Sequence, residues 1–547
     1  STGVEKSQVF FDWYELEYHK KLRTENGHLE FWSEKQDKVY EYHVRGADQN
    51  WTVAEVSDPF NVRLFQPRVD DSTLVFQDSS SVQGGGRHYL LMSSDKIQTA
   101  AQPQPIENAF PNLGRPERGA DYVIITAPEF KGRALDQLAE HRRDSRFWPH
   151  PGQPQVEIVT TSEIYNEFSA GLIDPTAIRN FLRYAYFHWR VAPSYVLLVG
   201  DACFDIKNNN GGSPKTFVPV YEEGLLASDD WFVCMEDDQI TDMYIGRLPV
   251  HNQQELATVV QKIITYDTAL PPGPWKNSLL MVADDQNSPD ITYEDYVFGR
   301  DSELMAEDSV SARFDMQKIY LSQYSRNAFG KKPRVKQALI DAINQGRLYV
   351  NFLGHGNHEV LTHEDILRSP DYMGSLVNGN RLPLFFAGTC AVGQFDYDRK
   401  NCMAEELLLR ENGGCLSVIA STRWNAHLIT SAINQDFYRA VFSADEPAPS
   451  IGQALAGAKL NSRYPEHRQL LLLFGDPAQR LAIPSFTVPC RLQPDTLSLS
   501  RNVFIKGAIE RNQQTATDFT GSLFLKFYEN TISRPQMGYT IDRKSVV

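Results

Sequence analysis

The chain has 547 residues, too many for a single hydrophobic core, and this length predicts three or four domains. Its apolar content of 41% and charged content of 22% are ordinary for a folded protein. The net charge of -15 argues against non-specific binding to nucleic acid or to an anionic membrane, so no nucleic-acid partner is expected.

The sequence has few signals of membrane insertion, export or disulfide bonding. No apolar run reaches the length of a transmembrane helix. The chain starts at Ser1 without a Met, which fits a processed or trimmed chain whose export signal has been removed. The 6 cysteines include no CxxC pair, which argues against both a disulfide scaffold and a structural zinc knuckle.

The first hundred residues carry short runs of nearly alternating apolar and polar residues, a pattern typical of β-strands. Turn-rich pieces separate these runs, and a Pro- and Gly-rich stretch at 102–119 indicates a linker. Residues 1–117 are therefore predicted to form one or more N-terminal β domains of the sandwich type. The runs are 38–46, 51–56, 61–66, 72–78 and 88–94.

From about residue 120, continuous apolar runs alternate with helical patterns. Such runs suit strands buried on both faces of a parallel sheet, and the alternation predicts an α/β domain with helices on both faces. One helix should begin with Asp174 as its N-cap and Pro175 in its first turn. The runs are 121–128, 193–201, 277–285, 346–356, 382–390 and 413–422, and the helical patterns are 174–190, 252–267, 332–346 and 401–414.

A Pro-rich piece at residues 269–275 divides this α/β region. It predicts a first subdomain over 118–270 and a second, catalytic subdomain over 271–487. β-type signals return after residue 490 and predict a small immunoglobulin-like sandwich over 488–547, which need not be complete at Val547.

Reactive residues follow three of the apolar runs. Gly354, His355 and Gly356 follow one, Cys390 another, and Asp284 with Asp285 a third. Because ligands bind beyond the carboxyl ends of strands in open parallel sheets, neighbouring strands would bring these residues to one edge.

A Cys, a His and a carboxylate at one edge provide a nucleophile, a base and an orienting group. Gly356 lets the backbone turn sharply after the base. The N–H groups of Gly356 and Cys390 are candidates for an oxyanion hole. In the alternative interpretation, Cys390 is a packed core residue and His355 a loop residue.

A metal site is a competing interpretation of the three histidines at 355, 358 and 363, with Glu359 or Glu364 as a further ligand. The HExxH arrangement needs a helix to align its ligands, whereas His355 follows a strand and stands between glycines. No zinc site is therefore predicted. Structural calcium is separate, and the acidic loops 284–290 and 236–242 could bind it.

Two segments carry a resemblance to a known family. "YVNFLGHGNHE" is followed, thirty-five positions after His355, by Cys390 in "LFFAGTCAVGQFD". This pair resembles the gingipain-type cysteine peptidases of family C25, which have Gly-His-Gly after one strand and Ala-Cys before an Asp-containing loop. Four further segments resemble segments of this family and follow each other in the same order along the chain. They are "SYVLLVGD", "SDDWFVCMEDDQITDMYIGRLPV", "MAEELLLRENGGCLSVIASTRWN" and "LLLFGDPAQRLAI".

The resemblance covers residues 120–485 and implies a caspase-like α/β/α fold in two subdomains, often with structural calcium and with no required cofactor. It implies that Cys390 is the nucleophile and His355 the base of a cysteine endopeptidase. The family has a Glu as the third member, and Asp284 is the expected counterpart here, with Asp285 as the alternative.

Two residues are candidates for a substrate pocket. Asp295 lies eleven positions after Asp284, where Arg-specific members carry an acidic residue, although its segment also fits an exposed helix start. His358 is expected in the loop or the substrate groove.

The β residues before the catalytic domain resemble the sortase branch of this family, from the type IX secretion system of Bacteroidetes. That likeness implies an exported protein at the cell surface or outer membrane. Its substrates would be exported cargo proteins with a C-terminal signal domain, its acceptor an anionic lipopolysaccharide, and its partner an outer-membrane protein of the PorV type. The alternatives are a gingipain-like secreted endopeptidase and a non-enzymatic surface scaffold.

Overall fold

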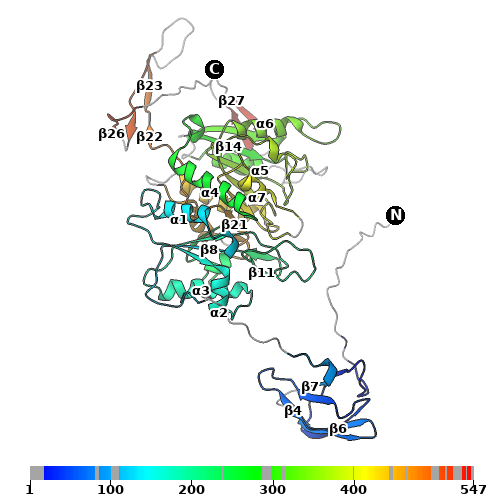
Figure 1. The fold of residues 1–547 in the computed structure, drawn as a ribbon. Coiled ribbons are helices and arrows are strands. Elements are labelled where there is room, and N and C mark those ends of the chain that lie inside the picture. Colours follow the sequence, from blue (N-terminus) through cyan, green and yellow to red (C-terminus); the bar gives the residue numbers. More distant parts are fainter. Residues whose placement is uncertain are drawn as a thin grey trace. The chain divides into compact units, whose positions relative to one another are not determined.

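The computed structural model forms two compact units, Ser1–Glu107 and Asn108–Val547 (Figure 1). No helix in the described part of the chain is long and apolar enough to cross a membrane. The structure describes residues 16, 18–80, 86–99, 110–236, 238–285, 297–308, 314–397, 400–442, 448–462, 465–493, 504–511, 514–520, 532–536 and 539–543.

The first unit consists of antiparallel strands in two sheets, ordered β1-β7-β3-β4 and β2-β6-β5. Their inward side chains, among them Val44, Val53, Phe76 and Tyr89, form one apolar cluster. The five runs predicted as strands are strands, because alternation buries one face of each. The strands are β1 His28–Trp32, β2 Lys38–Arg45, β3 Trp51–Glu55, β4 Arg63–Phe65, β5 Arg68–Asp70, β6 Thr73–Ser80 and β7 His88–Ser93.

The second unit is built on one ten-stranded sheet, ordered β15-β14-β16-β19-β20-β21-β13-β10-β8-β9. The six continuous apolar runs of the sequence correspond to fully buried strands, β8, β10, β14, β16, β19 and β20. The bounds of all ten strands are β8 Tyr122–Thr126, β9 Val156–Thr160, β10 Tyr195–Val199, β13 Tyr244–Leu248, β14 Ser278–Ala283, β15 Asp315–Tyr320, β16 Tyr349–Leu353, β19 Leu384–Gly388, β20 Ser417–Ser421 and β21 Leu471–Phe474.

Helices cover both faces of this sheet, as predicted. One face packs against α1, α4, α6 and α7, and the other packs against α2 and α3 on one half and α5, α8 and α9 on the other. The predicted cap of α3 is present, since Asp174 accepts the Thr176 N–H at 2.8 Å. The helices are α1 Arg133–Arg143, α2 Thr161–Phe168, α3 Pro175–His188, α4 Gln253–Thr268, α5 Val297–Ala306, α6 Pro333–Asn344, α7 Met403–Leu409, α8 His427–Phe442, α9 Ile451–Leu460 and α10 Pro465–Arg468.

Smaller strands flank these elements. β11 Tyr221–Glu223 pairs with β12 Leu226–Ser228, and β17 Val360–Leu361 pairs with β18 Leu367–Arg368. The C-terminal region has antiparallel strands, but its assignment to one immunoglobulin-like domain stays a prediction. These strands are β22 Phe486–Thr487, β23 Cys490–Gln493, β24 Phe504–Gly507, β25 Glu510–Arg511, β26 Gln514–Thr515, β27 Ile532–Gln536 and β28 Tyr539–Arg543.

Strand direction reverses once in the ten-stranded sheet. Every neighbouring pair is parallel except β20 and β21, which are antiparallel. The sheet is therefore mixed, and its two halves present their carboxyl ends at opposite edges. β21, which lies within the predicted second subdomain, pairs with β20 on one side and with β13 on the other, so one continuous sheet runs through both predicted subdomains. The division into subdomains stays a prediction.

A fully buried arginine on β13 stabilises the loops that follow β10 and β12. Arg247 donates two hydrogen bonds of 2.7 Å to Asp229 and others to the carbonyls of Gly200, Val218 and Pro219. This arginine is the one in the Ile-Gly-Arg segment, so that motif has a structural function.

We predict that Arg247→Met lowers the free energy of unfolding by roughly 3–5 kcal/mol, because Asp229 would stay buried without its cation. Thermal and denaturant unfolding measure this change. The control is Arg146→Ala, which removes an exposed pair with Asp144 and should change stability by less than about 1 kcal/mol. Equal effects of the two substitutions would contradict the prediction.

Candidate active site

Three neighbouring strand tips form the candidate site. Asp284 follows β14 directly, His355 lies two residues beyond β16, and Cys390 lies two residues beyond β19. The strands run parallel in the order β14-β16-β19. The predicted gathering of these residues at one edge of the sheet is therefore present.

The carboxylate of Asp284 contacts both the backbone and the imidazole ring of His355. The Asp284 side chain is 1% exposed, and one carboxylate oxygen lies 3.4 Å from His355 Nδ1. The same oxygen accepts the His355 backbone N–H at 3.0 Å, and the other oxygen accepts the Asp285 N–H at 2.8 Å. This carboxylate can therefore fix the orientation of the imidazole.

Glycine is required beside this carboxylate because neighbouring side chains leave no room for a Cβ. A Cβ on Gly354 would lie 2.5 Å from the Asp284 Cβ and 2.8 Å from Phe352 Cζ. A Cβ on Gly356 would lie 2.9 Å from Oγ1 of Thr389, the residue before Cys390. The Gly-His-Gly sequence thus allows the histidine loop to pack against both neighbouring strand tips.

Cys390 is half-buried and donates a hydrogen bond of 3.5 Å to the Asn425 carbonyl. Burial raises the pKa of the Cys390 thiol above its usual value of 9.0. The next residue, Ala391, has a left-handed backbone with φ of 49°, and its N–H donates to the Arg423 carbonyl at 3.0 Å. The chain therefore turns sharply after Cys390.

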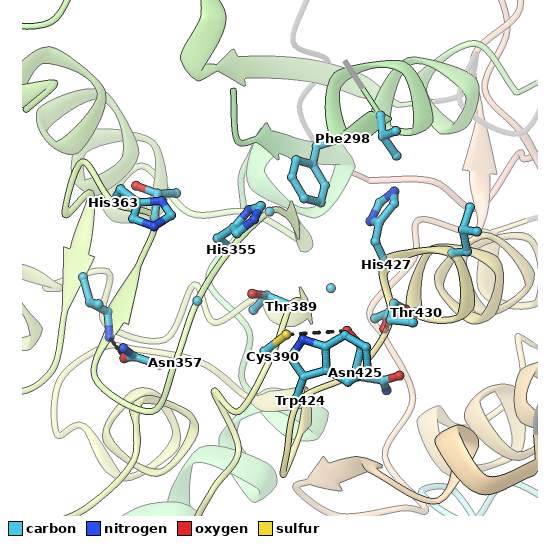
Figure 2. A pocket seen from close by; sticks show the side chains of 18 of the residues that line it. Phe298, His355, Asn357, His363, Thr389, Cys390, Trp424, Asn425, His427 and Thr430 are labelled. Atoms are coloured by element: carbon cyan, nitrogen blue, oxygen red, sulfur yellow. Dashed lines mark hydrogen bonds between the residues drawn. The ribbon is translucent and has the colours of Figure 1, made fainter. Parts of the chain in front are cut away.

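A cavity of about 800 Å³ opens beside Cys390 (Figure 2). The His355 side chain is 43% exposed, and the Phe298 ring stands perpendicular to it at a centroid distance of 5.2 Å. The lining residues are Val297, Phe298, Gly354, His355, Gly356, Asn357, Val360, Thr362, His363, Arg368, Gly388, Thr389, Cys390, Trp424, Asn425, Ala426, His427, Leu428 and Thr430.

One wall of the cavity was not predicted from the sequence. Trp424, Asn425 and His427 follow β20, whose tip lies at the same edge as the other three. His427 Nε2 lies 2.9 Å from a carboxylate oxygen of Asp301 on α5. The rule of strand tips would have found the segment after β20, but nothing in the sequence joins it to α5.

The other sequence candidates lie in different surroundings. Asp285 pairs with Lys332 and lies 3.7 Å from Arg326, so Asp284 rather than Asp285 contacts His355. His358 lies 3.4 Å from Glu359 and against the Tyr397 ring, outside the lining of the cavity. Asp295 falls outside the described residues. The catalytic, oxyanion-hole and pocket assignments stay predictions.

Two groups of side chains have the spacing of metal ligands among the described residues. One is Asp201, His251 and Glu405, and the other is Asp284, Asp285 and Glu364. Burial alone would lower the pKa of His251, but hydrogen bonds to Asp201 and Glu255 raise this pKa to about 11. The first group therefore already holds an imidazolium cation.

The second group is neutralised by protein cations as well. Lys332 pairs with Asp285, and Arg326 lies 3.0 Å from Glu364. Calcium prefers oxygen ligands free of competing cations, so neither group suits the structural calcium that the family resemblance implies. Of the two acidic loops considered for calcium, 286–290 and residue 237 lie outside the described residues.

A family model supports the resemblance. The model described as "Peptidase family C25" matches residues 115–482. Gingipain R2 of Porphyromonas gingivalis is 22% identical over 422 residues, which cover 73% of this chain and 50% of the relative. The chain spans half or less of the length of the curated relatives it matches.

The chain is similar to two solved structures. The Arg specific cysteine proteinase gingipain R superposes with a TM-score of 0.54 at 18% identity, over 71% of this chain and 83% of that one. Dimeric latent PorU of Porphyromonas gingivalis superposes with a TM-score of 0.46 at 16% identity, over 96% of this chain and 46% of that one. The first likeness shows the fold alone.

We predict that Gly354→Ala destabilises the site and lowers activity, because its Cβ would displace Asp284. The control is Gly374→Ala, where a Cβ would meet nothing within 4 Å. The unfolding midpoint and the rate of Cys390 alkylation measure both effects. If the two variants behave alike, the close packing at Gly354 is not required.

The alkylation of the Cys390 thiol should depend on pH. Since burial raises the pKa of this thiol above its usual value, the thiol form dominates at neutral pH. Its alkylation by iodoacetamide should therefore keep rising with pH from pH 7 to pH 9, by up to about tenfold per pH unit. Mass spectrometry separates this signal from that of the exposed Cys490, and Cys390→Ser removes it. A rate that is already maximal below pH 7 would show a resting thiolate instead.

Proposed function

The chain belongs to peptidase family C25, and on this premise we propose that it is a cysteine endopeptidase with Cys390 as nucleophile and His355 as base. The fold is the caspase-like α/β/α fold of the gingipains, built on a large mixed sheet. One observation supports the proposal most: Asp284, His355 and Cys390 follow three neighbouring strands, Asp284 contacts His355, and both His355 and Cys390 line one cavity.

The proposed reaction begins with a protonated thiol. His355 takes the proton of Cys390 while Sγ attacks the carbonyl carbon of the scissile peptide bond. The C–N bond then breaks, the leaving amine takes the proton from His355, and the acyl group remains on Cys390 as a thioester. Asp284 holds the imidazole in place, and the N–H groups of Gly356 and Cys390 stabilise the developing oxyanion.

The fate of the thioester decides between hydrolysis and transfer. Attack by water releases a carboxylic acid, whereas attack by an amine forms a new amide bond. We infer transfer, as in the sortase PorU. The substrates would be exported cargo proteins with a C-terminal signal domain, and the acceptor would be an anionic lipopolysaccharide at the outer membrane, with a PorV-type partner.

The N-terminal unit supports this choice. About a hundred residues with two antiparallel sheets precede the catalytic domain, whereas mature secreted gingipains begin close to it. The second candidate is a gingipain-like secreted endopeptidase, which the match to gingipain R2 favours. Both candidates use the same three residues, so only the products separate them.

We predict that Cys390→Ala abolishes removal of the cargo signal domain and that His355→Gln lowers it by about 10²–10⁴-fold, because the base is lost. Asp284→Asn should lower kcat more than it raises KM, since it disturbs orientation rather than binding. Mass spectrometry of cargo C-termini measures both the cleavage position and any attached acceptor.

The matched control is Cys490→Ala, which removes an exposed cysteine outside the cavity. Normal processing in the Cys390→Ala strain would leave only a scaffold role. Free carboxylates at the cleaved cargo ends would favour the secreted endopeptidase, and an attached amine would favour the sortase.

A further inference from the structure

The cavity beside Cys390 has no acidic residue in its described lining. Besides Cys390, its titratable side chains are Arg368 and the three histidines His355, His363 and His427. A buried guanidinium or ammonium group needs a carboxylate partner, because desolvating an unpaired charge is costly. The described part of the lining therefore offers no partner to the side chain of Arg or Lys.

Asp301, which contacts His427, cannot pair with the side chain of a bound Arg or Lys either. Asp301 is 5% exposed, and one of its oxygens accepts from His427 Nε2 at 2.9 Å and from the Ser431 hydroxyl at 2.8 Å. Its other oxygen accepts from Arg300 at 2.9 Å and 3.0 Å. Burial would raise the pKa of Asp301, but these bonds lower it, so the group is ionised and already neutralised by its neighbours.

The carboxylates near His355 also contact polar or charged groups of this chain. Asp284 is 1% exposed behind the imidazole that it orients, and Glu364 is buried against Arg326 at 3.0 Å. Glu359 pairs with Lys400. Each of these acidic groups therefore has a partner from this chain.

The remaining surface of the cavity is mainly apolar. Phe298 stands edge-on between His355 and His427, with centroid distances of 5.2 Å and 4.6 Å (Figure 2). Val297 and Ala426 also line the cavity. At the rim, Trp424 is 69% exposed and Leu428 is 72% exposed. Large apolar side chains exposed around a cavity mark a binding surface.

We propose that this cavity binds an uncharged, apolar side chain of the substrate next to the scissile bond and excludes Arg and Lys. The inference rests on the proposed peptidase function and adds its substrate class. Phe298, Trp424 and Leu428 supply the contact surface, while the Asp301–His427 pair forms a wall without a free negative charge. This preference differs from that of the Arg specific proteinase with which the fold is shared.

The first test compares peptides that differ only in the residue before the cleaved bond. Peptide coumarylamides ending in Leu or Phe should show at least about tenfold higher kcat/KM than those ending in Arg or Lys. A preference for Arg or Lys would overturn the inference. Repeating the assay with Asp295→Asn then shows whether that acidic residue is the source of the basic preference.

The second test adds the missing charge. Leu428→Asp should raise kcat/KM for the Arg peptide relative to the Leu peptide by about tenfold, as one opposite charge near a protein surface permits. The control is Leu460→Asp, which adds the same charge at a position 56% exposed at the end of α9 and outside the cavity. An equal response of both variants would overturn the assignment of Leu428 to the pocket.

Failure of the peptidase function can be distinguished from failure of this inference. If no peptide is cleaved, the proposed function is wrong for such substrates. Calorimetric binding of the same peptides to the full Cys390→Ala chain then still decides the substrate class. Tighter binding of the Leu and Phe peptides supports the inference, and tighter binding of the Arg peptide or equal binding of all overturns it.

Discussion

The parallel order of β14, β16 and β19 is the constraint on which the site depends. Each strand delivers one side chain at its carboxyl end, so adjacency in the sheet becomes adjacency in the site. β20 runs in the same direction and adds Trp424 and His427 to the same edge. Because direction reverses at β21, the first half of the sheet contributes none of its strand tips to this edge.

The packing of β21 between β20 and β13 also explains why the sequence contains the Ile-Gly-Arg and Phe-Gly-Asp-Pro segments. A Cβ on Gly246 would meet the carbonyl of Gly475, and a Cβ on Gly475 would meet Ser417 of β20, so neither position leaves room for a side chain. Asp476 accepts from Arg142 at 2.7 Å and from Tyr122 at 2.8 Å. The Ile-Gly-Arg and Phe-Gly-Asp-Pro segments therefore pack β21 against both of its neighbours and do not line the cavity.

Local patterns predicted much of this architecture. Apolar runs located the strands, and the rule that ligands bind beyond strand ends placed His355, Cys390 and Asp284 together. Long-range pairing was not predictable, because nothing near β21 shows that it joins β13, and nothing near His427 points to Asp301, 126 positions away. Similarly, the sequence alone does not distinguish Asp284 from Asp285. In the structure, Asp285 pairs with Lys332 and lies near Arg326, which leaves Asp284 to contact His355.

The three histidines at 355, 358 and 363 have different neighbours in the structure. His355 contacts a buried carboxylate and lines the cavity beside Cys390. His363 lines the same cavity with its ring 5.6 Å from that of His355, whereas His358 contacts Glu359 and Tyr397. The sequence already distinguished His355, which follows a strand and stands between glycines, but the contacts of the other two depend on how the loop folds.

The surroundings of Cys390 have a consequence for oxidative damage. Peroxides and disulfides react with thiolates far faster than with thiols. Burial raises the pKa of the Cys390 thiol, and the thiol donates a hydrogen bond to the Asn425 carbonyl, so both effects favour the thiol over the thiolate. A thiol in these surroundings is converted to a sulfenic acid more slowly than an exposed one, which suits a protein in oxidising surroundings.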